Sequence, residues 1–92
     1  MELIGIENFR LIDRNKAAAD TFFNYNNQTV KAEFFFYLQG MDCLSIRVGR
    51  HDTAISTKEL ENYINENRID LKKQVKPDVV RVREEQRARL VE

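Results

Sequence analysis

The chain contains a single cysteine, Cys43, and a single histidine, His51, and their scarcity excludes several kinds of site. One cysteine cannot form an internal disulfide, and one cysteine with one histidine cannot build a structural zinc site. His51 and Asp52 are adjacent, but a catalytic triad needs a nucleophile, a base and an orienting group that converge in space. We therefore expect no enzyme activity, no metal site and no cofactor.

Glycine is also scarce. Gly5, Gly40 and Gly49 are isolated from one another, so the sequence has no phosphate-binding loop. The sequence also has no excess of positive or negative charge, because its 15 basic and 15 acidic residues give a formal net charge of zero. That balance argues against a strongly basic nucleic-acid binder and against an acidic DNA mimic.

Long apolar runs are missing from the sequence. None approaches the length of a membrane-spanning helix, and the first residues lack the basic and apolar regions of a secretory signal. We therefore expect a cytoplasmic protein with no membrane partner. The 92 residues are too few to divide, because neither half would bury a sufficient core, so the sequence predicts one domain over residues 1–92.

Residues 28–50 have the alternation of a β-hairpin. From residue 30 to residue 39, apolar side chains at even positions alternate with charged and aromatic ones, which is typical of a half-buried strand. Residues 40–42 form the loop, so that Gln39 pairs with Cys43. This register puts the apolar residues on one face, in the cross-strand pairs Leu38–Leu44, Phe36–Ile46 and Phe34–Val48. A slip by one residue would expose half of them.

Two further strands are expected before the hairpin. Residues 3–13 supply apolar side chains, and a step from even to odd positions predicts a bulge near residues 7–8. The apolar residues are Ile4, Ile6, Phe9 and Leu11. Residues 16–25 include three alanines that favour a helix, but alternation favours a strand. A strand followed by a two-residue turn at residues 26–27 would place Phe23 opposite Val30. We favour the strand, with a helix over residues 16–23 as the alternative.

A helix is expected after the hairpin. Ser56 and Glu59 have the spacing of a capping box, in which their side chains bind the first free amides of a helix. An apolar stripe follows, formed by Leu60, Tyr63, Ile64 and Leu71. We expect this helix over residues 56–73, packed on the sheet face that carries Phe34, Phe36, Leu44 and Ile46.

The C-terminal segment is less clearly patterned. Pro77 disfavours helical structure at Lys76, so residues 77–92 form a separate segment, either a second helix or a partly mobile tail. Residues 79–83 also fit a strand. The predicted fold class is α+β, a small four-stranded antiparallel β-meander over residues 1–50 that is covered on one face by a helix.

The outward side of the hairpin is the candidate binding surface, because aromatic residues and arginine are typical of interface hot spots. Its residues are Phe35, Tyr37, Arg47 and Lys31, and Phe22 lies beside them if residues 16–25 form a strand. Small charge-balanced domains without catalytic groups commonly act as adaptors, subunits or stoichiometric inhibitors. We therefore expect a non-enzymatic protein-binding module whose partner is another protein or protein complex. This hypothesis includes an inhibitor of a host defence complex, of the kind that phages and plasmids encode, and also a homodimer.

Single-stranded nucleic acid is the alternative partner, because bases stack on aromatic side chains. The basic residues that would contact phosphates are Arg68, Lys72, Lys73, Lys76, Arg81, Arg83, Arg87 and Arg89. Acidic residues are interleaved with them, whereas phosphate binding usually requires a basic excess. A third hypothesis is that the C-terminal segment covers Phe35 and Tyr37, which would then be core residues.

Overall fold

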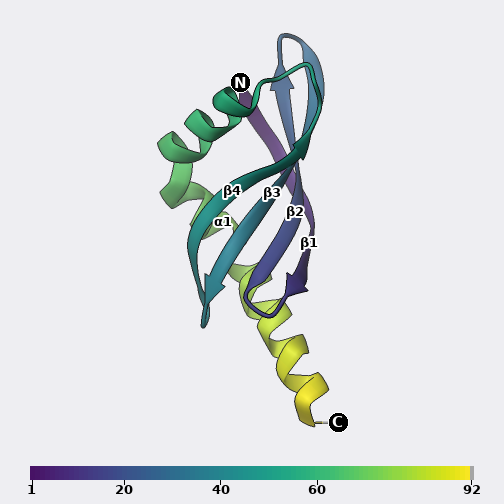
Figure 1. Ribbon diagram of the computed structural model, residues 1–92, viewed down its shortest axis with the longest axis vertical. Helices are drawn as coiled ribbons and strands as arrows, with labels where there is room; N and C mark the ends of the chain where they lie inside the picture. Colours follow the sequence, from purple (N-terminus) through teal and green to yellow (C-terminus); the bar gives the residue numbers. More distant parts are fainter. Residues whose placement is uncertain (92) are drawn as a thin grey trace.

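The computed structural model describes residues 1–91, with side chains through Arg89. It contains four strands and one long helix: β1 (Glu2–Asp13), β2 (Lys16–Tyr25), β3 (Gln28–Gln39), β4 (Asp42–His51) and α1 (Thr57–Val91). The strands form one sheet in the order β1-β2-β3-β4, and each pairs antiparallel with the next. α1 crosses one face of this sheet, and its C-terminal turns extend past the end of the strands (Figure 1). The predicted α+β fold with a four-stranded meander is confirmed.

β2 is a strand, as the alternation predicted, and its alanines have a packing role. Ala17 lies opposite Phe36 and Ala19 lies opposite Phe34 on the adjacent strand. Small residues there leave room for the large rings of β3, and all of these side chains are fully buried. The helical alternative for residues 16–23 is therefore wrong, because burial beside β3 overrides the helix propensity of alanine.

The turn between β2 and β3 has the predicted two residues. Asn26 and Asn27 both have positive φ, 50° and 63°, which asparagine tolerates well and which matches the right-handed twist of the strands. Phe23 consequently lies opposite Val30, as expected.

The turn between β3 and β4 differs from the prediction. Gly40, with φ of 58°, and Met41 connect Gln39 directly to Asp42, so Leu38 lies opposite Cys43. A register shift then leaves Leu44 without a partner, and its side chain is 55% exposed. The expected pairing of Gln39 with Cys43 and the expected core position of Leu44 are both wrong. The tighter turn requires one extra residue in β4, and this bulge restores the predicted pairs Phe36–Ile46 and Phe34–Val48.

β1 contains the predicted bulge. Its register against β2 shifts between Glu7 and Arg10, where Asn8 has a positive φ of 56°. The bulge turns Phe9 into the core, where its ring centroid lies 5.4 Å from that of Phe36. A further shift near Ile4 leaves that side chain 59% exposed, so it does not join the core as expected.

α1 is one helical element from residue 57 to residue 91, interrupted by non-helical backbone angles at Asn67. There the Asn67 side chain donates a 3.0 Å hydrogen bond to the carbonyl of Tyr63. The predicted break near residues 74–76 and the alternative strand at residues 79–83 are wrong. The Ser56 half of the predicted capping box is present, because the Glu59 amide donates to the Ser56 hydroxyl oxygen over 3.1 Å. The reciprocal hydrogen bond from the Ser56 amide to the Glu59 carboxylate is absent among the described residues. The predicted end of the segment, residue 92, lies outside the described residues.

Burial explains why Pro77 does not end α1. Proline removes the amide that would bind the carbonyl of Lys73, but both residues lie on the exposed side, where solvent can bind that carbonyl. Across Pro77 the opposite side of the helix stays buried, at Leu71, Val75, Val79 and Val82. Its core residues are Leu60, Ile64, Leu71, Val75, Val79 and Val82, which pack with Phe34 and Phe36.

Candidate functional site: the outward sheet face

The face of the sheet opposite α1 is here called the outward face. Side-chain alternation separates Phe35 and Tyr37 from Phe34 and Phe36, which pack against the helix. α1 contacts β4 and β1 from the core side. The hypothesis that the C-terminal segment covers Phe35 and Tyr37 is therefore wrong for the described residues of α1. Both aromatic side chains are half-buried.

Phe35 is held against the sheet by small neighbours. A Cβ placed on Gly49 would lie 2.9 Å from the Phe35 ring, so the ring occupies the space that a side chain would fill. Ala18, the cross-strand partner of Phe35 on β2, is fully buried although it lies on the outward face. A ring over a glycine restores apolar packing that the strand would otherwise lack.

Lys16 completes an aromatic cluster at this end of the face. Its ammonium nitrogen lies 4.3 Å from the centroid of the Phe35 ring and 5.4 Å from that of Tyr37. Both distances fall within the range of cation–π attraction. Arg47 lies opposite Phe35 on β4 and is exposed. We call these four residues, Lys16, Phe35, Tyr37 and Arg47, the aromatic end of the outward face.

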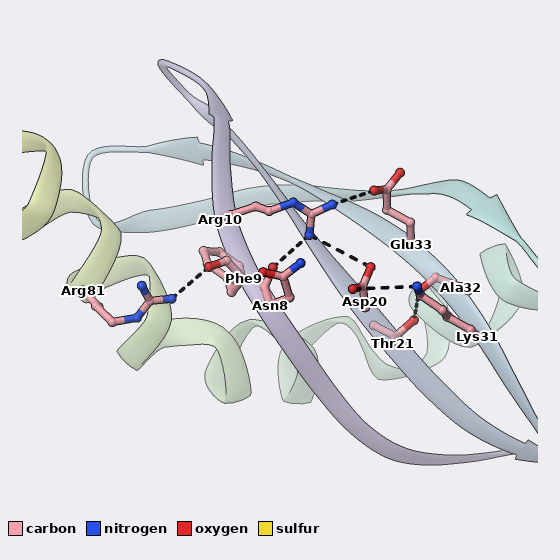
Figure 2. Close-up of polar contacts among 9 residues, drawn as sticks. All are labelled: Asn8, Phe9, Arg10, Asp20, Thr21, Lys31, Ala32, Glu33 and Arg81. Carbon is pink, nitrogen blue, oxygen red and sulfur yellow. Dashed lines mark hydrogen bonds and ion pairs between the residues drawn. The ribbon is translucent and has the colours of Figure 1, made fainter.

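The middle of the outward face carries an ionic cluster (Figure 2). The Arg10 guanidinium reaches from β1 to the Glu33 carboxylate, 2.9 Å away, and lies 4.0 Å from Asp20. Lys31 approaches the other oxygen of Asp20 at 3.9 Å. Both carboxylates therefore have cationic partners on the same face.

The aromatic end has a different charge pattern. Lys16 and Arg47 form no ion pair with any residue in the range 1–91. Asp13 is the cross-strand partner of Lys16, but its carboxylate accepts the amide of Arg14 over 2.7 Å. Within the described residues, the cations at the aromatic end are thus outside any ion pair, whereas those in the middle of the face are paired.

The five predicted surface residues are divided between these two regions. Phe35, Tyr37 and Arg47 meet at the aromatic end, in the predicted register of Phe35 with Arg47. Lys31 belongs to the ionic cluster, and Phe22 lies opposite Lys31, away from the aromatic end. The prediction missed the part played by Lys16, although the two-residue turn at residues 26–27 already places that residue opposite Tyr37.

The predicted basic segment is largely engaged in holding α1 to the sheet. Lys72 donates to the carbonyl of Leu44 over 3.1 Å, and Lys76 donates to that of Met41 over 2.7 Å. Arg81 donates to the carbonyl of Phe9 over 2.9 Å (Figure 2). Arg83 binds the carbonyls of Gly40 and Arg14 and the side chain of Asn15, over 2.8, 2.9 and 3.0 Å. The remaining members, Arg68, Lys73, Arg87 and Arg89, are exposed.

His51 and Asp52 make separate structural contacts. The Asp52 carboxylate accepts the amide of Lys31 over 2.8 Å. The His51 ring instead lies 2.8 Å from the Thr57 hydroxyl through Nε2 and 2.9 Å from the Asp52 carbonyl through Nδ1. These contacts join the end of β4 to the start of α1, and the imidazole does not contact the carboxylate.

The remaining chemistry-bearing groups are unremarkable. Burial raises the pKa of the Cys43 thiol. The nearby Lys72 ammonium and a hydrogen bond to the backbone of Ser45 lower this pKa, but by less than burial raises it. Within residues 1–91, no group of histidine, cysteine or carboxylate side chains is arranged to hold a metal ion. No helix in that range is long and apolar enough to cross a membrane.

Comparisons with known proteins add no assignment. No protein-family model, no curated protein and no solved structure matches this chain. The geometry of the outward face is therefore the basis on which a function can be proposed.

Proposed function

We propose that this protein is a non-enzymatic binding module that attaches to another protein through its outward face. The observation that carries this proposal is that α1 leaves Phe35 and Tyr37 on the uncovered side of the sheet, beside the unpaired cations Lys16 and Arg47. Aromatic residues and arginine are enriched where protein interfaces concentrate their binding energy. An adaptor, a subunit or a stoichiometric inhibitor fits this role, in the cytoplasm.

The strand edges are less suited to binding than the face. β1 has three register irregularities, and such bulges hinder pairing with a further strand. On β4 a lysine of α1 binds the carbonyl of Leu44, and a second lysine binds that of Met41 in the preceding turn. A partner that added a strand would have to displace these contacts, whereas the outward face is already open.

Nucleic acid is less well supported than protein as the partner. The ionic cluster combines two carboxylates, Asp20 and Glu33, with the cations Arg10 and Lys31, so the middle of the outward face has no net positive charge to attract phosphates. Lys72, Lys76, Arg81 and Arg83 are engaged with backbone carbonyls. Half of the basic segment on α1 is therefore already used to hold the helix to the sheet, whereas phosphate binding usually requires a basic excess.

The test is affinity capture of partners from bacterial lysate, with and without nuclease, using the wild type and the double variant Tyr37→Ser/Arg47→Ser. We expect nuclease-resistant capture that the double variant loses while its melting temperature stays close to that of the wild type. The matched control, Lys73→Ser/Arg87→Ser, removes two exposed basic residues of α1 and should retain the partner. Capture that disappears with nuclease, or that only the control variant loses, would contradict the proposal and favour nucleic acid.

A further inference from the structure

The distribution of charge on the outward face indicates what kind of protein surface it fits. Asp20 and Glu33 are paired with Arg10 and Lys31, so the middle of the face has little charge left to satisfy. Lys16 and Arg47 form no ion pair within residues 1–91, and the carboxylate of Asp13, the cross-strand neighbour of Lys16, accepts the amide of Arg14 instead. An incoming surface therefore gains most if it brings carboxylates to the aromatic end.

The two cations flank the aromatic pair. Lys16 belongs to β2 and Arg47 to β4, and β3 lies between them with Phe35 and Tyr37. Adjacent strands are about 4.8 Å apart, and the two positions are offset by two residues, about 7 Å, along β3, so the backbones of the two cationic residues lie roughly 12 Å apart. Lys16 extends over both rings, which places its ammonium above the aromatic surface rather than out in solvent.

Building on the function proposed above, we propose that the aromatic end binds an acidic segment of a partner protein, in which two carboxylates flank an apolar side chain. In an extended segment, residues i, i+2 and i+4 point the same way and span about 13 Å. Carboxylates at the outer positions pair with Arg47 and with Lys16, whose ammonium lies over the rings, and the apolar side chain between them contacts the remaining exposed surface of Phe35 and Tyr37. Such charge complementarity fixes the register and increases the association rate.

A second copy of the chain is a poorer occupant of this surface. Its own outward face presents the carboxylates of Asp20 and Glu33 already bound to Arg10 and Lys31. Stacking two outward faces would also bring the unpaired cations of each copy to the interface without supplying a free carboxylate from that face. A partner with unpaired acidic residues has no such cost.

The test is an amide NMR titration of the full chain with a synthetic peptide that has glutamate, leucine and glutamate at alternate positions and serine between them. The same peptide with glutamine for glutamate and a ten-nucleotide oligothymidine serve as comparison probes. We expect the acidic peptide to shift the amide signals of Lys16, Phe35, Tyr37 and Arg47. The glutamine peptide should bind at least about tenfold more weakly, because each interfacial charge pair contributes on the order of that factor or more.

Variants of the chain make the test specific. Lys16→Gln/Arg47→Gln should lower the affinity for the acidic peptide by about tenfold or more. Lys73→Gln/Arg87→Gln, which removes the same charge from α1, should leave this affinity unchanged. The charge reversal Lys16→Glu/Arg47→Glu should bind a peptide with lysine in place of glutamate. The amide spectrum of each variant reports directly whether it is folded.

Three outcomes would overturn the inference. They are equal affinity for the acidic and glutamine peptides, peptide-induced shifts that avoid the aromatic end, and binding of oligothymidine alone. If lysate capture still depends on Tyr37 and Arg47 in these cases, the proposed function stands and only the acidic chemistry of the partner is wrong. If capture is also independent of these residues, both proposals fail.

Discussion

The ring of Phe35 lies directly over Gly49, at a distance that leaves no room for a methyl group on that glycine. The two residues belong to adjacent strands, β3 and β4, and meet on the outward face. The glycine lets the ring lie close to the backbone, where Lys16 can extend over it. Part of the proposed binding surface therefore also packs against the sheet.

The first prediction concerns this contact. Gly49→Ala would bring a methyl group to 2.9 Å from the ring and to 3.1 Å from the carbonyl oxygen of Glu33, so the ring must move. We expect a loss of about 1–3 kcal/mol in the free energy of unfolding, measured by urea denaturation. Gly5→Ala is the control, because a methyl group there meets nothing within 4 Å, and it should be neutral or slightly stabilising. Equal effects at the two glycines would contradict the packing role of Phe35.

The second prediction concerns Pro77. Because α1 continues through this residue on its exposed side, Pro77→Ala restores an amide for the Lys73 carbonyl without disturbing the core. Proline costs up to about 3 kcal/mol in a helix interior, so we expect the variant to be more stable by about 1–3 kcal/mol in urea denaturation. Val75→Ala, on the buried side, should instead destabilise by about 2 kcal/mol. An unchanged stability for Pro77→Ala would mean that the helix is divided there.

The strands were predictable from the sequence because their side-chain alternation extends over many residues. The pairs of Phe36 with Ile46 and of Phe35 with Arg47 follow from burying one apolar face. The turn at Gly40 and Met41 did not follow, because alternation alone does not distinguish a three-residue loop from a two-residue turn with a bulge. Only the backbone shows that Leu44 is the extra residue.

The predicted division of the helix before Pro77 is wrong because the local effect of proline is smaller than the effect of burial. Proline disfavours a helix by about 3 kcal/mol, whereas burying each of Val75, Val79 and Val82 contributes roughly 1.5–3 kcal/mol. The summed burial of these valines outweighs the cost of proline, so the helix continues through Pro77. The helical spacing of the valines after Leu71 can be seen in the sequence. The contact of Lys16 with the two rings was harder to foresee, since a flexible side chain can extend in several directions.

The third prediction concerns pH. Burial raises the pKa of the Cys43 thiol above its ordinary value of 9.0, so the folded state binds this proton more tightly than the unfolded state. The resulting stabilisation is complete below the unfolded pKa and is lost as the pH rises through the folded pKa. We expect the free energy of unfolding to fall as the pH rises above about 8.5 in the wild type, and to fall less in Cys43→Ser, which lacks a titrating thiol. Identical slopes in urea denaturation would show that the thiol does not contribute.

The fourth prediction separates the structural from the exposed basic residues of α1. Arg83 binds the carbonyls of Gly40 and Arg14 and thereby holds the helix against the turns at one end of the sheet. Arg83→Ala should therefore lower the free energy of unfolding by about 1–2 kcal/mol, since these hydrogen bonds involve a charged donor but lie partly in solvent.

Arg87→Ala is the control for Arg83→Ala, because Arg87 is an exposed arginine one helical turn further along α1. Its stability in urea should be close to that of the wild type. If Arg83→Ala also left the free energy of unfolding unchanged, the guanidinium would be free to bind an external anion. The basic segment would then again be a candidate phosphate-binding surface. A clear difference between the two variants would instead mean that the charge of Arg83 serves the fold, which leaves the outward face as the better-supported site of binding.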